Sequence, residues 1–530
     1  MNRSKDHASD QSITSASRSA GSASGSDFLQ LDIADAPVGG LSDWLALRLR
    51  LAISDGRLPV GSTLPATRVL AAELRVSRGV VTEAYQRLIE DGHAAGRGRS
   101  GTVVVAAPIT APVAAPVPAR VVAPAAPPAS APGPGDPFAS APGLDVFDAL
   151  RAAPARINLS PGVPDLAAFP RTAWLRAERS VLHDLQPSDL GYGDPRGAPA
   201  LRLAVANWLA RNRGIRVDPG EVIIVAGVAQ ALTLLAQVLQ HDGISAVAVE
   251  DPGSLGACQH LRSWGLTTPP VPVDSEGLRV DELRASGAQA VLLTPAHQFP
   301  TGAVLGGVRR RELMRWAGEG GLIIEDDYDA EHRYDRPPVA ALRSMLAEQV
   351  CYAGSVSKLL APALRVGWLL APPKYQDALV DAKRFADLGN AVLPQLVLAR
   401  LMESGEMERH LRFIRRRHRR RRDAMIAAIG THLPGAVVHG AAAGLHLMIT
   451  FEADAEADAG GAPGGEGGSA GFSDADLAAE ALTRGVKVQP LSWHSQRPNR
   501  PGLVLGYAAS TPTDIAEGVA ILGKALRAAG

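Results

Sequence analysis

The chain has 530 residues, of which 46% are hydrophobic, and its formal net charge is zero. This length exceeds what one hydrophobic core serves, so more than one domain is expected. No stretch is long and apolar enough to span a membrane, and the first residues lack the apolar run of a signal peptide, so we expect a cytoplasmic protein that does not bind membranes. The two cysteines, Cys258 and Cys351, lie far apart in apolar segments, which predicts neither a disulfide nor a metal site.

The first 105 residues predict a tail followed by a small helical domain. Residues 1 to 35, rich in Ser, Ala and Asp, show no apolar periodicity and are expected to be disordered. Residues 36 to 105 contain an apolar helix at Leu41 to Ile53, two helical patterns separated by a short turn, and a glycine-flanked hairpin from Gly92 to Val104, the pattern of a winged helix-turn-helix. The residues spaced to pack against the first helix are Leu64, Leu70, Leu74, Val76, Val81, Tyr85 and Leu88.

Polar residues at the helix starts and in the hairpin are candidates for contacts to DNA. A recognition helix presents such residues to base edges and phosphates, and Ser77 is expected to cap its start. Nine arginines and six acidic residues between Leu41 and Val105 give this segment a local charge of +3. A domain that docks a protein, or arginines that only solvate a helix face, are the alternatives. The candidate DNA-binding residues are Arg68, Ser77, Arg78, Thr82, Arg97 and Arg99.

The same segment resembles the GntR family of DNA-binding regulators. LPATRVLA, the VSR turn, AYQRL and the closing glycine hairpin stand in the order that this family shows. The resemblance implies that Arg68, Arg78 and the hairpin arginines contact double-stranded DNA. Gly79 departs from the common pattern, in which a polar residue stands there, so no base contact is expected at that position.

Residues 106 to 156 are predicted to form a linker. From Ala106 to about Ala141 the chain is almost entirely Ala, Pro, Val and Gly, and its prolines prevent a regular helix. As polyproline II, at ~3.1 Å per residue, this stretch would reach on the order of 100 Å. It is therefore long enough to carry the DNA-binding domain to a partner protomer.

Two later segments place functional groups at the ends of predicted strands. VIIVAGVAQALTLLAQVL, from Val222, reads as a strand, a turn and an amphipathic helix whose free amides at Val228 and Ala229 form an anion site. LIIEDDYDAEHRY, from Leu322, reads as a buried strand that ends at Asp326 and Tyr328. A carboxylate there can keep a pyridine nitrogen protonated, and a phenol can bind the 3-oxygen of the ring. Asp327 and Asp329 fit a solvated strand end better.

A lysine between two serines follows the next apolar strand. In YAGSVSKLLAPALR, the amine of Lys358 would form a Schiff base with a phosphorylated aldehyde, while Ser355, Ser357 and Arg365 would hold the phosphate. A Ser-x-x-Lys sequence also occurs in serine acyl-enzymes, and a lysine in a turn is commonly a solvated surface group.

Residues 157 to 530 resemble the fold-type I aminotransferases, since GYGDPRGAPALR, VAVEDPG, TPAHQFPTG, IIEDDYD and GSVSK follow one another at similar spacings. The resemblance implies an α/β large domain at 157 to 400, a small α+β domain at 401 to 530 with a Gly/Ala-rich insertion near 453 to 471, and pyridoxal 5′-phosphate as cofactor. Lys358 would be its Schiff-base lysine, and Tyr192 would reach the cofactor of the partner subunit. The other implied cofactor contacts are Val228, Ala229, Asp326, Tyr328, Ser355, Ser357 and Arg365.

A GntR-like winged helix joined to such a domain resembles the MocR family of regulators. Membership implies a head-to-tail homodimer in which the cofactor is used for sensing. The effector would be pyridoxal phosphate itself, or an amine or amino acid. Val504 stands where aminotransferases carry the arginine that binds the substrate carboxylate, Ser254 replaces a tyrosine near the cofactor, and Phe299 replaces the asparagine that contacts the 3-oxygen. These replacements favour a sensor over the alternative, an active aminotransferase with a DNA-binding domain. Arg497 and Arg500 are candidate substitute anchors.

The arginine run from Arg409 to Asp423 has two interpretations. Leu411, Ile414, His418 and Arg421 fall on one helical face, which favours a helix between the large and small domains with most of its arginines solvated. A path for DNA around the dimer is the alternative.

Overall fold

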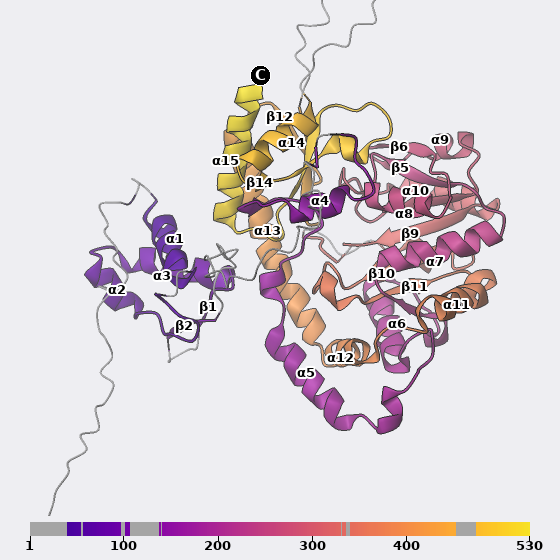
Figure 1. Ribbon diagram of the computed structural model, residues 1–530, viewed down its shortest axis with the longest axis horizontal. Helices are drawn as coiled ribbons and strands as arrows, with labels where there is room; N and C mark the ends of the chain where they lie inside the picture. The colour runs from indigo at the N-terminus through magenta and orange to yellow at the C-terminus, as the bar shows by residue number, and fades with distance from the viewer. Residues whose placement is uncertain are drawn as a thin grey trace, which may run out of the picture. The chain divides into compact units, whose positions relative to one another are not determined.

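The structure, a computed structural model, describes residues 36, 40–54, 57–96, 101–105, 137–138, 140–329, 331–334, 340–451 and 473–529. The chain divides into two compact units, Met1–Val121 and Val122–Gly530, and each is described by itself (Figure 1). The predicted tail, most of the predicted linker, the Gly/Ala-rich insertion and the hairpin residues Arg97 and Arg99 lie outside the described residues.

The described part of the first unit contains three helices and a two-stranded hairpin. The elements are α1 (Leu41–Ser54), α2 (Thr67–Glu73), α3 (Arg78–Glu90), β1 (Ala94–Gly96) and β2 (Thr102–Val104). The two strands pair antiparallel, with Ala95 opposite Val103. Leu49, Leu70 and Leu88 are fully buried where the three helices meet, because the helical spacing of the apolar residues turns one face of each helix inward. The predicted winged helix-turn-helix is confirmed.

A mixed eight-stranded sheet forms the centre of the second unit. Its strand order is β4-β11-β10-β9-β8-β5-β6-β7, and the pairs from β10 through β9, β8 and β5 to β6 are parallel. Parallel strands end at a common edge, which is where open α/β sheets bind ligands. The strands are β4 (Ile223–Val225), β5 (Val247–Asp251), β6 (Pro270–Asp274), β7 (Gly277–Leu278), β8 (Ala290–Leu293), β9 (Leu322–Asp327), β10 (Val350–Ser355) and β11 (Gly367–Leu370).

Helices cover both faces of this sheet, so most positions of its strands are apolar, and carboxylates stand toward the carboxyl ends of β5, β6 and β9. Ile324 packs with the helices α7, α8 and α11, whereas its neighbour Ile323 packs with α9 and α10, as the period of two in a strand requires. Trp368 packs with α6 and α12. The predicted α/β large domain is confirmed. Its helices are α5 (Arg171–Asp184), α6 (Pro199–Arg213), α7 (Val228–His241), α8 (Leu255–Ser263), α9 (Val280–Ala285), α10 (Gly307–Gly318), α11 (Pro373–Asp387) and α12 (Val392–Glu403).

A smaller α+β domain follows, built on a four-stranded sheet of order β12-β13-β16-β15. In this sheet Met448 lies opposite Val504, and Gln489 pairs with Val504 from the other side. Leu447, Leu503 and Leu505 are buried against the helices α13, α14 and α15. The elements are α13 (Glu406–His432), β12 (Ala436–His439), β13 (His446–Phe451), α14 (Asp474–Thr483), β14 (Val486–Lys487), β15 (Gln489–Pro490), β16 (Gly502–Gly506) and α15 (Pro512–Ala529).

The segment that enters the second unit is attached to this smaller domain. β3 (Ile157–Asn158) pairs parallel with β14, and Ile157 is buried in the small-domain core. Before it, α4 (Val146–Ala152) buries Val146 and Leu150 against Trp493. The range predicted as linker therefore contains a packed helix near its end. Sequence composition shows the prolines of this range but not the aromatic side chain, more than 300 residues later, that the helix covers.

The arginine run lies on α13, which passes from the large-domain core at Ile414 to the small-domain core at Met425 (Figure 1). Its predicted buried face is observed, and five of its arginines are exposed: Arg409, Arg412, Arg416, Arg419 and Arg420. Arg417 and Arg421 were not expected to carry an internal ion pair. Both contact the buried carboxylate of Asp165, at 2.7 and 2.8 Å.

Candidate functional site

Lys358 lies just beyond the end of β10, at the edge of the sheet where β9 also ends. Its Nζ donates a hydrogen bond of 2.5 Å to the carbonyl oxygen of Gly162. Burial lowers the pKa of the Lys358 amine, although the carboxylates of Asp326 and Asp329 act in the opposite direction. A lowered pKa raises the fraction of neutral amine, which is the form that attacks an aldehyde.

Asp326 and Asp327 each have one buried carboxylate oxygen without a hydrogen-bond partner among the described residues, and of the two it is Asp326 that lines the small cavity at this edge. Oδ1 of Asp326 is buried and has no hydrogen-bond partner within the described part of the chain. Burial, followed by the charges of Asp327 and Asp329, raises the pKa of Asp326 to about 7. Together with Glu250 and Phe299, Asp326 lines a small cavity. A ring N–H placed in that cavity would satisfy the unpaired oxygen.

Asp327 and Asp329 are buried, so the expectation of a solvated strand end is wrong for both. Asp327 lies on the opposite face of β9 from Asp326, where its Oδ2 is 2.5 Å from Nε of Arg213 and accepts a hydrogen bond from Tyr352. Asp329 pairs with His297. Both partners are distant in sequence, so the acidic string itself does not reveal them.

The residues predicted to hold a phosphate converge at the start of α7. Gly227 precedes the helix with φ of 93°, and a Cβ built on it would lie 3.5 Å from Nη1 of Arg365. A Cβ on Gly367 would lie 3.0 Å from Cα of Gly227 and 3.1 Å from Cβ of Ser355, so glycine at both positions lets the strand end and the helix start meet. Ser355 accepts a hydrogen bond of 3.4 Å from the amide of Ser357. Val228 and Ala229 begin α7, where backbone amides are free to bind an anion.

These groups fit pyridoxal phosphate. An amine with a lowered pKa, a buried carboxylate oxygen without a partner, and a guanidinium beside a helix start supply what the aldehyde, the ring nitrogen and the phosphate require. Lys358, Asp326 and Arg365 would hold the three ends of the cofactor. These three residues come from different segments of the chain, and the fold brings them to the same edge of the sheet.

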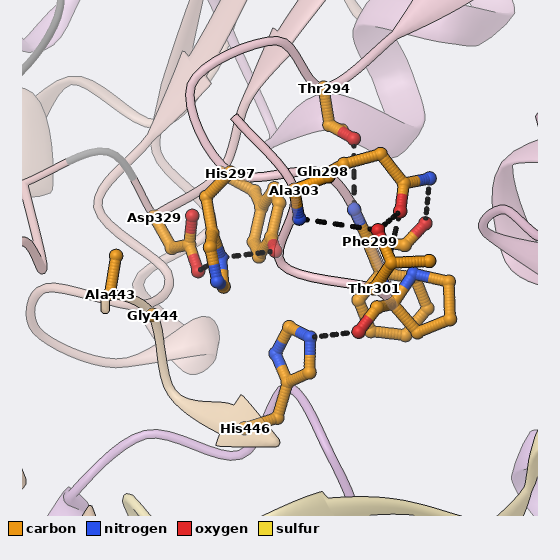
Figure 2. Close-up of polar contacts among 12 residues, drawn as sticks. Thr294, His297, Gln298, Phe299, Thr301, Ala303, Asp329, Ala443, Gly444 and His446 are labelled. Carbon is orange, nitrogen blue, oxygen red and sulfur yellow. Dashed lines mark hydrogen bonds and ion pairs between the residues drawn. The ribbon is translucent and has the colours of Figure 1, made fainter. Parts of the chain in front are cut away.

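Tyr328 contacts a group that the sequence did not assign. Its Oη lies 3.1 Å from Nδ1 of His297, which is also 2.8 Å from Oδ2 of Asp329. His446 stands nearby, and its Nε2 donates to the carbonyl of Pro300 at 3.2 Å (Figure 2). The ligand-type atoms of His297, Asp329 and His446 all lie within 4.8 Å of one another, but hydrogen bonds account for this cluster. The motif TPAHQFPTG contained the signal, since it places a histidine in the segment that faces the cofactor site.

Val504, which the sequence predicts to stand in place of a carboxylate-binding arginine, lies in an apolar cluster. Val504 is fully buried with Met448 and Leu491, and Phe299 packs against them. The ring of Phe299 also lies against His446 and His494, each with a centroid distance of 5.0 Å. Burial lowers the pKa of His446 to about 3 and that of His494 to about 4, so both imidazoles are neutral at pH 7.

Neither of the two arginines predicted as alternative carboxylate anchors lies in this cluster. Arg497 and Arg500 are both exposed, and the guanidinium of Arg497 donates to the carbonyl of Pro270. Ser254 caps α8, where its hydroxyl accepts a hydrogen bond from the amide of Ala257.

Tyr192 does not point into a buried site of its own protomer, since it is 94% exposed. It lines a separate surface cavity of about 790 Å³, which Leu388 and Asn390 also line.

The described DNA-binding candidates share the exposed side of the two helices of the helix-turn-helix. Arg68, Ser77, Arg78 and Thr82 are all exposed. Arg78 donates to the hydroxyl of Thr67 at 3.3 Å, which links the start of α3 to the start of α2. Ser77 is the N-cap residue of α3, but its hydroxyl makes no capping hydrogen bond. That hydroxyl is therefore available to a phosphate.

Two family models match the chain: bacterial regulatory proteins of the gntR family at residues 41–104, and aminotransferase class I and II at residues 154–520. The chain is 31% identical over 491 residues to the probable rhizopine catabolism regulatory protein MocR of Rhizobium meliloti, which covers 91% of this chain and 92% of that protein. It is 29% identical over 407 residues to the HTH-type pyridoxine biosynthesis transcriptional regulator PdxR of Corynebacterium glutamicum, which covers 76% of this chain and 82% of that protein.

Among solved structures, the alpha-aminoadipate aminotransferase LysN of Thermus thermophilus, complexed with N-(5′-phosphopyridoxyl)-L-leucine, has a TM-score of 0.62. It is 28% identical to this chain, and the match covers 72% of this chain and 94% of that one. The chain therefore belongs to the MocR-type regulators of the GntR family, in which a GntR helix-turn-helix domain is joined to a domain of the class I and II aminotransferases.

Proposed function

We propose that this regulator binds pyridoxal phosphate at Lys358 and that occupancy of this site, by the cofactor or by its adduct with an amine or amino acid, changes how the chain binds its DNA operator. The observation that carries the proposal is the pairing, at one sheet edge, of a buried amine with a lowered pKa and a buried carboxylate oxygen without a partner. The relatives named as transcriptional regulators support the DNA-binding half.

Each protein group has a definite task at this site. Pyridoxal phosphate supplies an aldehyde that condenses reversibly with a primary amine, and a ring that withdraws electrons. Asp326 holds a proton on the ring nitrogen, because its buried charge is stabilised when a cation lies beside it. Arg365, Ser355, Ser357 and the amides of Val228 and Ala229 bind the phosphate. Tyr328 donates to the 3-oxygen of the ring.

Coupling to DNA requires that the ligand bind two arrangements of the protein with different affinities. We assign this role to a head-to-tail homodimer. The support is Tyr192, which is almost fully exposed and lines a large surface cavity in one protomer, as expected of a residue that reaches the site of its partner. Arg68, Ser77, Arg78 and Thr82 would contact the operator.

The test compares Lys358→Ala with Lys374→Ala, a change at an exposed lysine paired with Asp242. Pyridoxal phosphate should give a visible absorbance band with the wild-type chain and with Lys374→Ala, and no band with Lys358→Ala. Footprinting on DNA upstream of the gene, with and without pyridoxal phosphate, then shows whether the cofactor changes operator binding. A normal response to the cofactor by Lys358→Ala would rule out covalent sensing.

An active aminotransferase is the second candidate, because the amine and the ring carboxylate are both in place. The apolar cluster at Val504 counts against it, since an α-carboxylate placed there would lie beside apolar and neutral side chains. Incubation with a panel of amino acids and 2-oxoglutarate separates the two functions. Sustained formation of keto acid would show that the chain is an enzyme.

A further inference from the structure

His297 occupies a buried position between Asp329 and Tyr328, and Figure 2 shows its ring beside the carboxylate of Asp329. The side chains of His297 and Asp329 are each 1% exposed. A Cβ built on Gly444, in the turn before β13, would lie 2.1 Å from Cε1 of His297, so only glycine lets the small domain approach this ring. The Gly444 carbonyl accepts a hydrogen bond of 2.7 Å from Tyr507, which fixes the turn against the imidazole.

The position of the imidazole proton follows from its partners. Burial acts to raise the pKa of Asp329, but the adjacent His297 outweighs it and the pKa lies below its usual value. Asp329 is therefore an ionised carboxylate, which only accepts hydrogen bonds. Nδ1 of His297 must carry the proton that joins it to Asp329 at 2.8 Å. The same N–H faces the oxygen of Tyr328 at 3.1 Å, so that oxygen is an acceptor toward His297.

This arrangement decides where the hydroxyl proton of Tyr328 points. With its oxygen turned to His297 as acceptor, the phenol still has its own proton to donate. Asp329 takes part in a hydrogen bond with this phenol, and a 3-oxygen on the cofactor side would compete with that carboxylate for the proton. Without His297, no imidazole N–H would compete for the carboxylate of Asp329, and the phenol would donate to that carboxylate more strongly. Burial and the charge of Asp329 raise the pKa of Tyr328 well above its usual value, so the phenol keeps its proton in either case.

We propose that His297 and Asp329 are positioning residues that direct the hydroxyl of Tyr328 to the 3-oxygen of the cofactor ring bound at Lys358. The inference rests on the proposed function, because it needs a ring at that site. It assigns to His297 a task that aminotransferases give to an asparagine at the position of Phe299, namely control of the hydrogen bonds at the 3-oxygen. Phe299 itself packs against Tyr328 edge to face, with a centroid distance of 6.2 Å.

Other ionisable groups face this trio and have to be separated from it in any titration. His446 and His332, with pKa values lowered by burial to about 3 and about 4, stay neutral above pH 5. The remaining groups that act on Asp329 or Tyr328 are Asp326, Glu250, Lys358, Tyr334 and Tyr507.

The test is a double-mutant cycle read by absorbance. Chains loaded with pyridoxal phosphate are titrated from pH 5.5 to 9, and the midpoint of the visible band is measured for the wild type and for His297→Leu, each with and without Tyr328→Phe. Loss of a hydrogen bond to the ionised 3-oxygen should raise the midpoint by about one pH unit in His297→Leu. In the Tyr328→Phe background the same change should have no further effect.

Two more variants keep the test decisive. His297→Asn places an amide near the position of Nδ1 and should keep the wild-type midpoint, whereas His297→Gln places its amide near Nε2 and should behave as His297→Leu does, even if the leucine variant does not fold. An equal shift with and without Tyr328, or equal midpoints for Asn and Gln, would overturn the inference. Absence of a Lys358-dependent band in the wild type would instead overturn the proposed function, and the inference with it.

Discussion

Asp326 and Asp327 are neighbours on β9, yet their carboxylates face opposite sides of the sheet and have opposite surroundings. Each carboxylate has one oxygen without a hydrogen-bond partner within the described chain, but Oδ2 of Asp327 lies 2.5 Å from the buried Nε of Arg213, whereas Asp326 lines the small cavity beside Phe299. The carboxylate of Asp327 therefore forms a buried ion pair on one face of the sheet. The other is left for a ligand.

The unpaired carboxylate should make the cofactor-free protein less stable as pH rises. The pKa of Asp326 is raised from 3.8 to about 7 in the folded chain, so the folded state holds a proton that the unfolded state has released between these values. The free energy of unfolding should fall from pH 4 to about pH 7 and then level off, with at most about 4 kcal/mol due to Asp326.

Urea unfolding at pH 5 and pH 8, for the wild type and Asp326→Asn, measures this contribution. Glu250, Glu325 and other buried carboxyls with a raised pKa add to the loss in both chains, so the difference between the chains isolates Asp326. Saturating pyridoxal phosphate should reduce the loss in the wild type. Equal losses in both chains would contradict the assignment.

The buried partner of Asp327 should contribute strongly to the stability of the folded chain. Arg213→Ala leaves the Asp327 carboxylate buried without its cation, which destabilises a protein by about 3–5 kcal/mol. The matched control is Arg211→Ala on the same helix, where an exposed pair with Glu408 at 3.1 Å is worth at most about 1 kcal/mol. Urea midpoints that shift equally for the two variants would show that Asp327 is not buried as described.

Arg365→Ala should weaken the binding of pyridoxal phosphate without changing its attachment chemistry. Loss of a charge-assisted hydrogen bond costs about 1.5–3 kcal/mol, which corresponds to a dissociation constant roughly 10-fold to 150-fold higher. Arg315→Ala, at an exposed arginine on α10, is the control. Titration of the visible band gives both constants, and affinity for pyridoxal, which lacks the phosphate, should be the same in all three chains. A parallel loss of pyridoxal affinity would place Arg365 elsewhere in the site.

Arg78→Ala should weaken operator binding and make it less dependent on salt. If Arg78 contacts a phosphate, its removal reduces the slope of log affinity against log salt by about one. Arg48→Ala, on α1 outside the helix-turn-helix pair, should leave the slope unchanged. Electrophoretic mobility shifts at several salt concentrations give the slopes, and an unchanged slope for Arg78→Ala would remove this residue from the phosphate contacts.

Much of the fold could be predicted because its signals are local. The helix-turn-helix depends on spacings within a few dozen residues, and β9 begins with the apolar run Leu322 to Ile324. Asp327 and Asp329 were misjudged because their partners are remote: Arg213 is 114 residues away and His297 is 32. The ion pairs of Asp165 with Arg417 and Arg421 on α13 are remote in the same way. The sequence identifies these residues as ionisable, but their partners become neighbours only when the chain folds.

The parallel pairing of β3 with β14 also determines where the DNA-binding unit is tethered. Ile157 belongs to the small-domain core and α4 packs on Trp493. The segment that follows the linker is therefore attached to the small domain and not to the sheet that carries Lys358. Any rotation of the small domain about α13 would move β3 and α4 with it. A movement of the small domain would therefore change the position at which the linker enters the second unit, while the sheet that carries Lys358 stays in place.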